Sequence, residues 1–142
     1  MDDSTIRRSA MNAFIIELEN RPGSLADTAA AIAEKGINIS GVAGATSGGM
    51  GVVAIVTNDE SATRTALQGI DCKFREVALA SAALEDKPGS LADAARRLAD
   101  AGVNIEAIFP TGMDAGRITV AFGVDNLEAA RSVLGQGASI GA

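Results

Sequence analysis

The chain has 142 residues and a formal net charge of −6, from 12 Lys and Arg against 18 Asp and Glu. It contains no His, Trp or Tyr and a single Cys, which excludes Ser/His/Asp and Cys/His catalytic arrangements and the usual His/Cys zinc site. The acidic balance and the scarcity of aromatic side chains argue against nucleic-acid binding.

The first half of the chain begins with a strand and a helix. Phe14–Leu18 is a short apolar run that predicts a buried strand, and Pro22-Gly23 turns the chain. The next apolar residues have the spacing of one helix face: Leu25, Ala29, Ile32 and Ala33, repeated later as Leu91, Ala95, Leu98 and Ala99. Gly36 and Gly102 are expected to end these helices in the left-handed conformation.

The following residues predict a hairpin, a second helix and a last strand. The ranges are Ile37–Ala45 and Val52–Thr57 for the hairpin strands, Asn58 or Asp59 to about Gln68 for the helix, and Cys72–Glu76 for the fourth strand. The order is therefore β-α-β-β-α-β, the ferredoxin-like plan.

This pattern occurs twice. Leu18–Asp27 recurs as Leu84–Asp93, an offset of 66 residues, and 13 of the 22 positions from Leu18 to Ile39 are identical to their counterparts. The alignment continues without a gap, so that Asp59 matches Asp125. We predict a lead at 1–10, a first domain at 11–76 and a second at 77–142, with the last strand of the first repeat running almost directly into the second repeat.

The second repeat has two irregular features. Pro110 falls late in its second strand, which suits an edge strand. Its tail, Gly135–Ala142, is rich in Gly and Ala, so its fourth strand is either poor or replaced by another segment, for which Asp2–Ala10 is a candidate.

A ferredoxin-like repeat with Pro-Gly-x-Leu before the first helix and Gly-(Ile/Val)-Asn-Ile at the second strand resembles the ACT domain. The segment from Glu19 to Ile39 is similar to the serine-sensing regulatory domain of phosphoglycerate dehydrogenase. The resemblance covers both repeats and implies an α+β fold of two ACT-like units packed side by side. It also implies that an amino acid or similar small ligand binds where two domains meet.

The resemblance assigns ligand contacts to three pairs of positions: Asn20 and Asp86, Gly23 and Gly89, and Asn38 and Asn104, the last pair from the neighbouring domain. The full predicted binding set is Asn20, Arg21, Pro22, Gly23, Ser24, Leu25, Asn38, Ile39, Asp86, Lys87, Pro88, Gly89, Ser90, Leu91, Asn104 and Ile105. Two departures leave the ligand open. Leu18 and Leu84 stand where the serine sensor has a His, and Asp86 replaces an Asn.

The residues of the loop have the chemistry of an amino-acid receptor. Backbone N–H groups near Gly23, Ser24 and Leu25 begin a helix and suit a carboxylate. Asn20 offers a donor and an acceptor, whereas ionised Asp86 offers acceptors alone and suits an ammonium group. If the second strands lie side by side, Asn20 shares a site with Asn104, and Asp86 shares one with Asn38. The two sites are then unequal.

We therefore expect a stand-alone, non-enzymatic regulatory protein without cofactor, metal or catalytic residues. It would be a homodimer that modulates an enzyme of amino-acid metabolism. The alternative is a protein-interaction module with degenerate pockets, such as a small regulatory subunit of the acetolactate synthase type. The Pro-Gly and Asn residues also have ordinary roles in turns. A third alternative, a catalytic ferredoxin-like enzyme, is disfavoured, and Asp86 with Lys87 is its remaining candidate pair.

The remaining features concern location. A single Cys forms no internal disulfide and favours a reducing, cytoplasmic compartment, and Cys72 is expected to be a buried, inert thiol. No apolar run approaches the roughly 20 residues of a membrane span. Met1–Met11 has no apolar region typical of a signal peptide, so neither a membrane nor a secretory route is expected.

Overall fold

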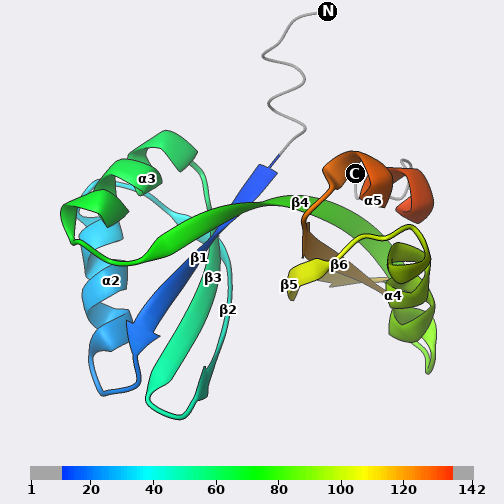
Figure 1. The fold of residues 1–142 in the computed structure, drawn as a ribbon, viewed down its shortest axis with the longest axis horizontal. Coiled ribbons are helices and arrows are strands. Elements are labelled where there is room, and N and C mark those ends of the chain that lie inside the picture. Colours follow the sequence, from blue (N-terminus) through cyan, green and yellow to red (C-terminus); the bar gives the residue numbers. More distant parts are fainter. Residues whose placement is uncertain (1–10, 136–142) are drawn as a thin grey trace, which may run out of the picture. The chain divides into compact units, whose positions relative to one another are not determined.

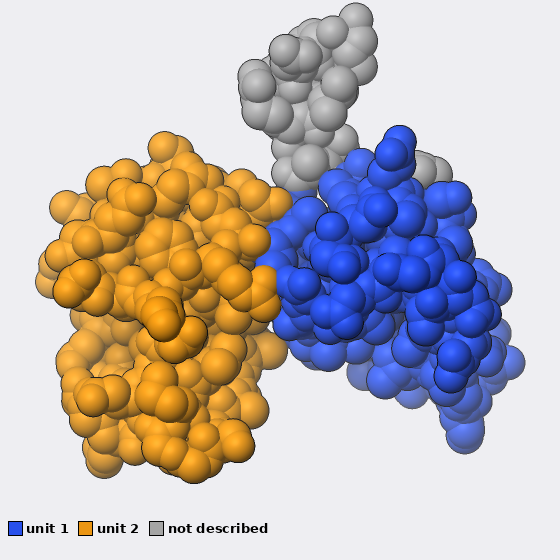
Figure 2. Space-filling view, in the orientation of Figure 1, with its two compact units in different colours: residues 1–11, 77–142 blue, residues 12–76 orange. Residues whose placement is uncertain are grey.

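The computed structural model describes residues 11–135, which form two compact units (Figures 1 and 2). Unit 2 comprises Asn12–Glu76, and the described residues from Val77 onward lie in unit 1. The strand order is β2 (Ile39–Ser47), β3 (Met50–Thr57), β1 (Met11–Glu19), β4, β6 (Arg117–Val124), β5 (Ile105–Asp114). β4 (Phe74–Glu85) is one strand that begins in unit 2 and continues into unit 1.

Unit 2 contains the complete β-α-β-β-α-β order. Its elements are β1 (Met11–Glu19), α2 (Ser24–Ala33), β2 (Ile39–Ser47), β3 (Met50–Thr57), α3 (Glu60–Gly69) and the start of β4. β3 pairs antiparallel with both β1 and β2. The two helices lie on one side of these strands (Figure 1). Phe14 and Ile16 of β1, Ile55 of β3, Ile32 of α2 and Leu67 of α3 form the centre of the core between them.

Unit 1 repeats the first five elements of this order. After its share of β4 come α4 (Ser90–Asp100), β5 (Ile105–Asp114), β6 (Arg117–Val124) and α5 (Leu127–Leu134). β6 pairs antiparallel with β4 and β5. Phe122 of β6 and Leu98 of α4 are fully buried at the centre of its core. The candidates for its fourth strand, 2–10 and the tail after residue 135, lie outside the described residues.

The helix ends follow the predicted local chemistry in both units. Gly36 and Gly102 both have φ 75°, which confirms the left-handed ends expected after α2 and α4. Asp59 begins α3 by accepting a hydrogen bond from the N–H of Ala62 at 3.0 Å, and Asn126 begins α5 in the same way. These glycines and caps place matching elements at matching positions in the two repeats.

Unit 1 contains one extra residue that the ungapped alignment missed. Pro110 pairs with Val120, but the next paired residue of β5 is Gly112, so Thr111 is bulged out of the ladder. In unit 2 the equivalent residues Gly44 and Ala45 are consecutive in the ladder. Proline cannot donate a ladder hydrogen bond, and a bulge beside it is a common solution on an edge strand.

The bulge changes the offset between the repeats from 66 to 67 residues. Ile105 and Val124 pair as Ile39 and Thr57 do, although 105 − 39 is 66 and 124 − 57 is 67. The predicted match of Asp59 with Asp125 is therefore wrong. Asn126 is the structural counterpart of Asp59, since each begins the second helix of its unit.

The predicted helix faces are also wrong in part. Leu25 is 52% exposed and Leu91 is 51% exposed, and Ala33 and Ala99 are exposed as well. The side chains that α2 and α4 bury are mostly small: Ser24, Thr28 and Ile32 in α2, and Ala94 and Leu98 in α4. Because successive residues of a helix are rotated by about 100°, the faces that bury Ser24 in α2 and Ala94 in α4 leave the side chains of Leu25 and Leu91 partly exposed.

Candidate functional site

The loop between β4 and α4 brings the second predicted set of binding residues to the start of a helix. Asp86 follows the last residue of β4, and its backbone N–H donates to the carbonyl of Gly116 in the β5–β6 hairpin at 2.8 Å. Gly89 precedes α4 with φ 94° and ψ −16°, in the left-handed region that favours glycine. The sequence Lys-Pro-Gly thus turns the chain so that α4 begins close to the end of β4.

The first turn of α4 has unused hydrogen-bond donors. Ser90 donates its N–H to the carbonyl of Lys87 at 3.4 Å, and Asp93 donates to Gly89 at 2.9 Å. Among the residues that the structure describes, no acceptor is found for the N–H groups of Leu91 and Ala92. These two donors carry the positive end of the helix dipole. The free donors at the start of α4 therefore begin at Leu91, one residue after Ser90.

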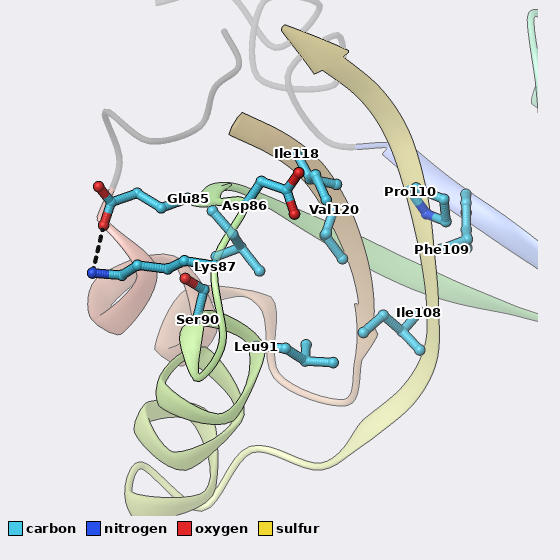
Figure 3. Close-up of a pocket in the computed structure, with 11 residues that line it drawn as sticks. Glu85, Asp86, Lys87, Ser90, Leu91, Ile108, Phe109, Pro110, Ile118 and Val120 are labelled. Carbon is cyan, nitrogen blue, oxygen red and sulfur yellow. Dashed lines mark ion pairs between the residues drawn. The ribbon is translucent and has the colours of Figure 1, made fainter. Parts of the chain in front are cut away.

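A pocket of about 350 Å³ lies beside this loop (Figure 3). Its lining residues come from β4, the loop, the start of α4, β5 and β6: Leu84, Glu85, Asp86, Lys87, Ser90, Leu91, Ile108, Phe109, Pro110, Ile118 and Val120. In Figure 3 the side chains of Leu91 and Ile108 point toward each other across the pocket. Polar side chains come from the end of β4, the loop and the start of α4, at Glu85–Lys87 and Ser90, whereas β5 and β6 contribute apolar ones.

The charges at the pocket are not equally free to meet a ligand. Lys87 forms an ion pair with Glu85 at 3.1 Å, and both side chains are largely exposed. Figure 3 shows this pair at one side of the pocket, whereas the carboxylate of Asp86 lies toward Ile118. Within residues 11–135 no hydrogen bond or ion pair engages that carboxylate. Asp86 therefore offers acceptors for a cationic group at the pocket wall.

The equivalent loop of unit 2 has the same backbone geometry but different polar groups. Gly23 has φ 94° before α2, and Arg21 pairs with Glu19 at 3.1 Å. The side-chain amide of Asn20 donates to the carbonyl of Gly48 in the adjacent hairpin at 2.9 Å. One of the two N–H donors of the Asn20 amide is thus already used inside its own unit.

The predicted Asn positions on the second strands are placed apart from these loops. The N–H of Asn38 donates to the side chain of Asn58 at 3.0 Å, and that of Asn104 donates to Asp125 at 2.9 Å. Both precede the first residue of their strand, whereas the loops contact the hairpin at its other end. Ile39 and Ile105 pack against the cores of their own units. The structure therefore brings together Asp86, Lys87, Ser90 and Leu91, but neither Asn104 nor Ile105 lines that pocket.

Sequence reasoning missed the apolar wall of the pocket, which Ile108, Phe109 and Pro110 of β5 form with Ile118 and Val120 of β6. The signal lay in the repeat itself. Pro110 corresponds to Gly44 and Ile118 corresponds to Gly51 by strand register, so the two repeats differ in side-chain size on this wall.

Three further features of the described residues concern metal binding, membrane spans and the single thiol. No group of His, Cys, Asp or Glu there has the arrangement of a metal site. No helix in residues 11–135 is long and apolar enough to cross a membrane. Cys72 is half-buried rather than buried as predicted; its thiol donates to the carbonyl of Leu67 at 3.6 Å, and desolvation raises its pKa.

A segment of unit 2 is similar to a known domain family. The ACT domain model matches residues 13–68. No curated protein sequence gives a significant match. The finer likeness to the serine-sensing domain of phosphoglycerate dehydrogenase stays a prediction.

Several solved structures share the fold over both units. A protein from Bacteroides thetaiotaomicron has a TM-score of 0.71 and 22% identity, over 88% of this chain and 86% of its own. The ligand-free regulatory subunit of aspartate kinase from Thermus thermophilus has a TM-score of 0.63 and 22% identity, over 92% and 93%. A structure of aspartokinase alpha and beta subunits has a TM-score of 0.62 and 21% identity, over 88% and 89%.

Proposed function

We propose that this protein is a regulatory protein that binds a free amino acid, or a similar small zwitterion, in the pocket of unit 1. The observation that carries the proposal is the pairing of opposite electrostatic features at one pocket. Asp86 and Leu91 both line the pocket: Asp86 supplies acceptors for an ammonium group, and the free N–H group of Leu91 begins a helix and supplies a donor for a carboxylate. The volume is at the lower end of the range of about 300–1,000 Å³ typical of small-molecule sites.

The comparisons support this proposal. Residues 13–68 match the ACT domain, whose members bind small ligands, and unit 1 repeats that segment in sequence and in element order. We therefore propose that unit 1 is ACT-like as well. Two of the fold neighbours are regulatory subunits of aspartate kinase, which supports a role in controlling an enzyme of amino-acid metabolism. Bound ligand would favour one conformation of the protein and so alter the activity of that enzyme.

The strand order supports a dimeric form of the site. β2 and β5 are the two end strands of the order, so they do not pair with each other within the chain. We propose that Asn38 and Asn104 reach the loops of a second copy, which keeps the predicted pairing of Asn20 with Asn104 and of Asp86 with Asn38. Light scattering coupled to gel filtration tests whether the chain is a dimer. A monomer that binds the active amino acid would overturn the proposed dimeric site.

The experiment that tests the function is thermal unfolding, followed by circular dichroism, with each of the twenty amino acids. A ligand at 100 times its dissociation constant adds about 2.7 kcal/mol of stability. Asp86→Asn should abolish the shift caused by the active amino acid. Asp114→Asn removes the same charge from an exposed hairpin residue outside the pocket lining and should leave the shift unchanged.

An interaction module is the second candidate, and β2 favours it. This nine-residue end strand contains no charged residue and no proline, and Val42 on it is 57% exposed. Such a strand is open to pairing with another chain. Twenty unchanged unfolding curves at millimolar ligand would overturn the amino-acid proposal in favour of this one.

A further inference from the structure

The two units differ at the wall of the pocket and not in the elements that carry it. Strand register matches each pocket residue of β5 and β6 with one of β2 and β3. The matched pairs, unit 1 first, are Ile108 with Val42, Phe109 with Ala43, Pro110 with Gly44, Ile118 with Gly51 and Val120 with Val53. Unit 1 therefore has the larger apolar side chain at four of the five positions.

The register also shows which of these side chains face the helices. Val120 and Phe122 lie in the helix-side core of unit 1, and they pair with Pro110 and Ile108 respectively. Directly paired residues of neighbouring strands project to the same face of a sheet. Ile108 and Pro110 therefore project to the face that α4 covers. Ile108 nevertheless remains 42% exposed, so this part of β5 is left uncovered.

The opening lies between β5 and the first turn of α4. Leu91 is 51% exposed and points toward Ile108 (Figure 3), although both are large apolar side chains. Val120, by contrast, is only 8% exposed. Two exposed aliphatic side chains that face each other across a pocket are suited to enclose an apolar group.

Polar and apolar groups of the lining are separated along the pocket. Glu85 ends β4, Asp86 and Lys87 belong to the loop and Ser90 begins α4, whereas β5 and β6 contribute no polar side chain to the lining. A ligand whose charged end meets Asp86 and the start of α4 therefore directs its other end to a wall without hydrogen-bonding side chains. A hydroxyl, amide or charge placed there would lose its water and gain no partner.

We propose that the pocket of unit 1 selects amino acids with a compact aliphatic side chain, of the size of valine, leucine or isoleucine. Ile108, Ile118 and Val120 form the side-chain subsite. The proposal rests on the function proposed above and adds the substrate class and the residues that determine it. Unit 2, with glycine at 44 and 51, has a different wall and does not share this preference.

Calorimetric titration of the full chain tests the proposal with valine, leucine, isoleucine, threonine, serine, lysine and aspartate. Valine and threonine have nearly the same shape, and an apolar pocket discriminates against an added hydroxyl by about 100-fold. We expect valine or a larger aliphatic amino acid to bind about 100-fold tighter than threonine. Lysine and aspartate should not compete for the site.

Ile108→Thr locates the subsite, because this residue is partly exposed and its replacement keeps a β-branched side chain on the strand. We expect it to weaken aliphatic amino-acid binding at least about ten-fold. Val42→Thr is the control at the matched position of unit 2 and should leave binding unchanged. Circular dichroism of both variants verifies that the fold is retained, and Ile118→Val, which removes one methyl group, provides a milder second variant.

The outcomes distinguish failure of the aliphatic preference from failure of the proposed amino-acid-binding function. Tighter binding of threonine, lysine or aspartate that Asp86→Asn abolishes would overturn the aliphatic preference and keep the amino-acid function. Loss of binding in Val42→Thr but not in Ile108→Thr would overturn the assignment to unit 1. Absence of heat and of any thermal shift with every amino acid would overturn the proposed function itself.

Discussion

Replacing Gly89 by alanine tests whether the start of α4 depends on a backbone conformation that L-residues avoid. Gly89 has φ 94° and ψ −16°, and a Cβ atom built on it meets no atom within 4 Å. The substitution therefore introduces no clash with a neighbour, and its cost comes from the left-handed backbone alone. For an L-residue that cost is about 1–2 kcal/mol.

The expected loss of stability is large enough to measure. In a domain of 60–100 residues, 1 kcal/mol shifts the midpoint of thermal unfolding by about 4–8 °C. Gly89→Ala should thus lower the midpoint of unit 1 by about 4–16 °C if the units unfold separately. The shift should be roughly half as large if the chain unfolds as one. Circular dichroism with temperature and with urea gives both the midpoint and the free energy.

Two control variants make the result specific. Gly112→Ala also places a Cβ in open space, but its φ is not in the left-handed region, so its stability should change little. Gly89→Asn should be intermediate, because Asn tolerates left-handed geometry better than alanine. If Gly89→Ala and Gly112→Ala have the same stability, the argument from backbone conformation is refuted.

Three further substitutions test other parts of the structure. Arg64 donates two hydrogen bonds to the carboxylate of Glu76 and lowers its pKa, so the ionised carboxylate stabilises the fold at neutral pH, and this contribution is lost as the pH falls through the lowered pKa. Glu76→Gln should therefore lower the midpoint of thermal unfolding at neutral pH and make the midpoint depend less on acid. An unchanged dependence of the midpoint on pH would contradict this. Ala115→Gly should raise stability by up to about 1 kcal/mol in urea unfolding, because residue 115 has φ 50°; a loss would show that the hairpin turn is not strained. Gly123→Ala should cost about 1–3 kcal/mol in the same assay, because its Cβ would lie 2.8 Å from Cγ2 of Val77, and a neutral result would mean that this contact relaxes freely.

The element order of the fold could be predicted because its signals are local. Helix-ending glycines such as Gly36 act through the φ of one residue, and a cap such as Asp59 acts through the N–H three residues later. A 66-residue repeat then presents each signal twice, which removes most of the ambiguity of a single occurrence. The continuity of β4 follows for the same reason, since no turn residue interrupts the sequence between Phe74 and Glu85.

The pocket wall could not be predicted because it depends on contacts between distant residues. Whether Ile118 faces the helices is set by its pairing with Leu84 and Met113, and a shift of one residue would turn it to the other face. The exposure of Leu91 depends on which stripe of α4 meets the sheet. Its apolar character suggested burial, but the small Ala94 takes that place.

The bulge at Thr111 affects both the local sequence pattern and the pairing of distant residues. An alignment of the repeats without a gap gives the correct counterparts through Pro110, but from Arg117 onward its counterparts are wrong by one residue. The bulge lies between these points, next to Pro110, which lines the pocket. The extra residue shifts the pairing register of β5 and β6 by one residue, and the caps and helices of the repeat keep their places. The Pro110 and Ile118 side chains, which replace Gly44 and Gly51, lie on either side of this point. The two units therefore keep one scaffold and differ at the surface that would meet a ligand, which is the difference that the matched variants Ile108→Thr and Val42→Thr test.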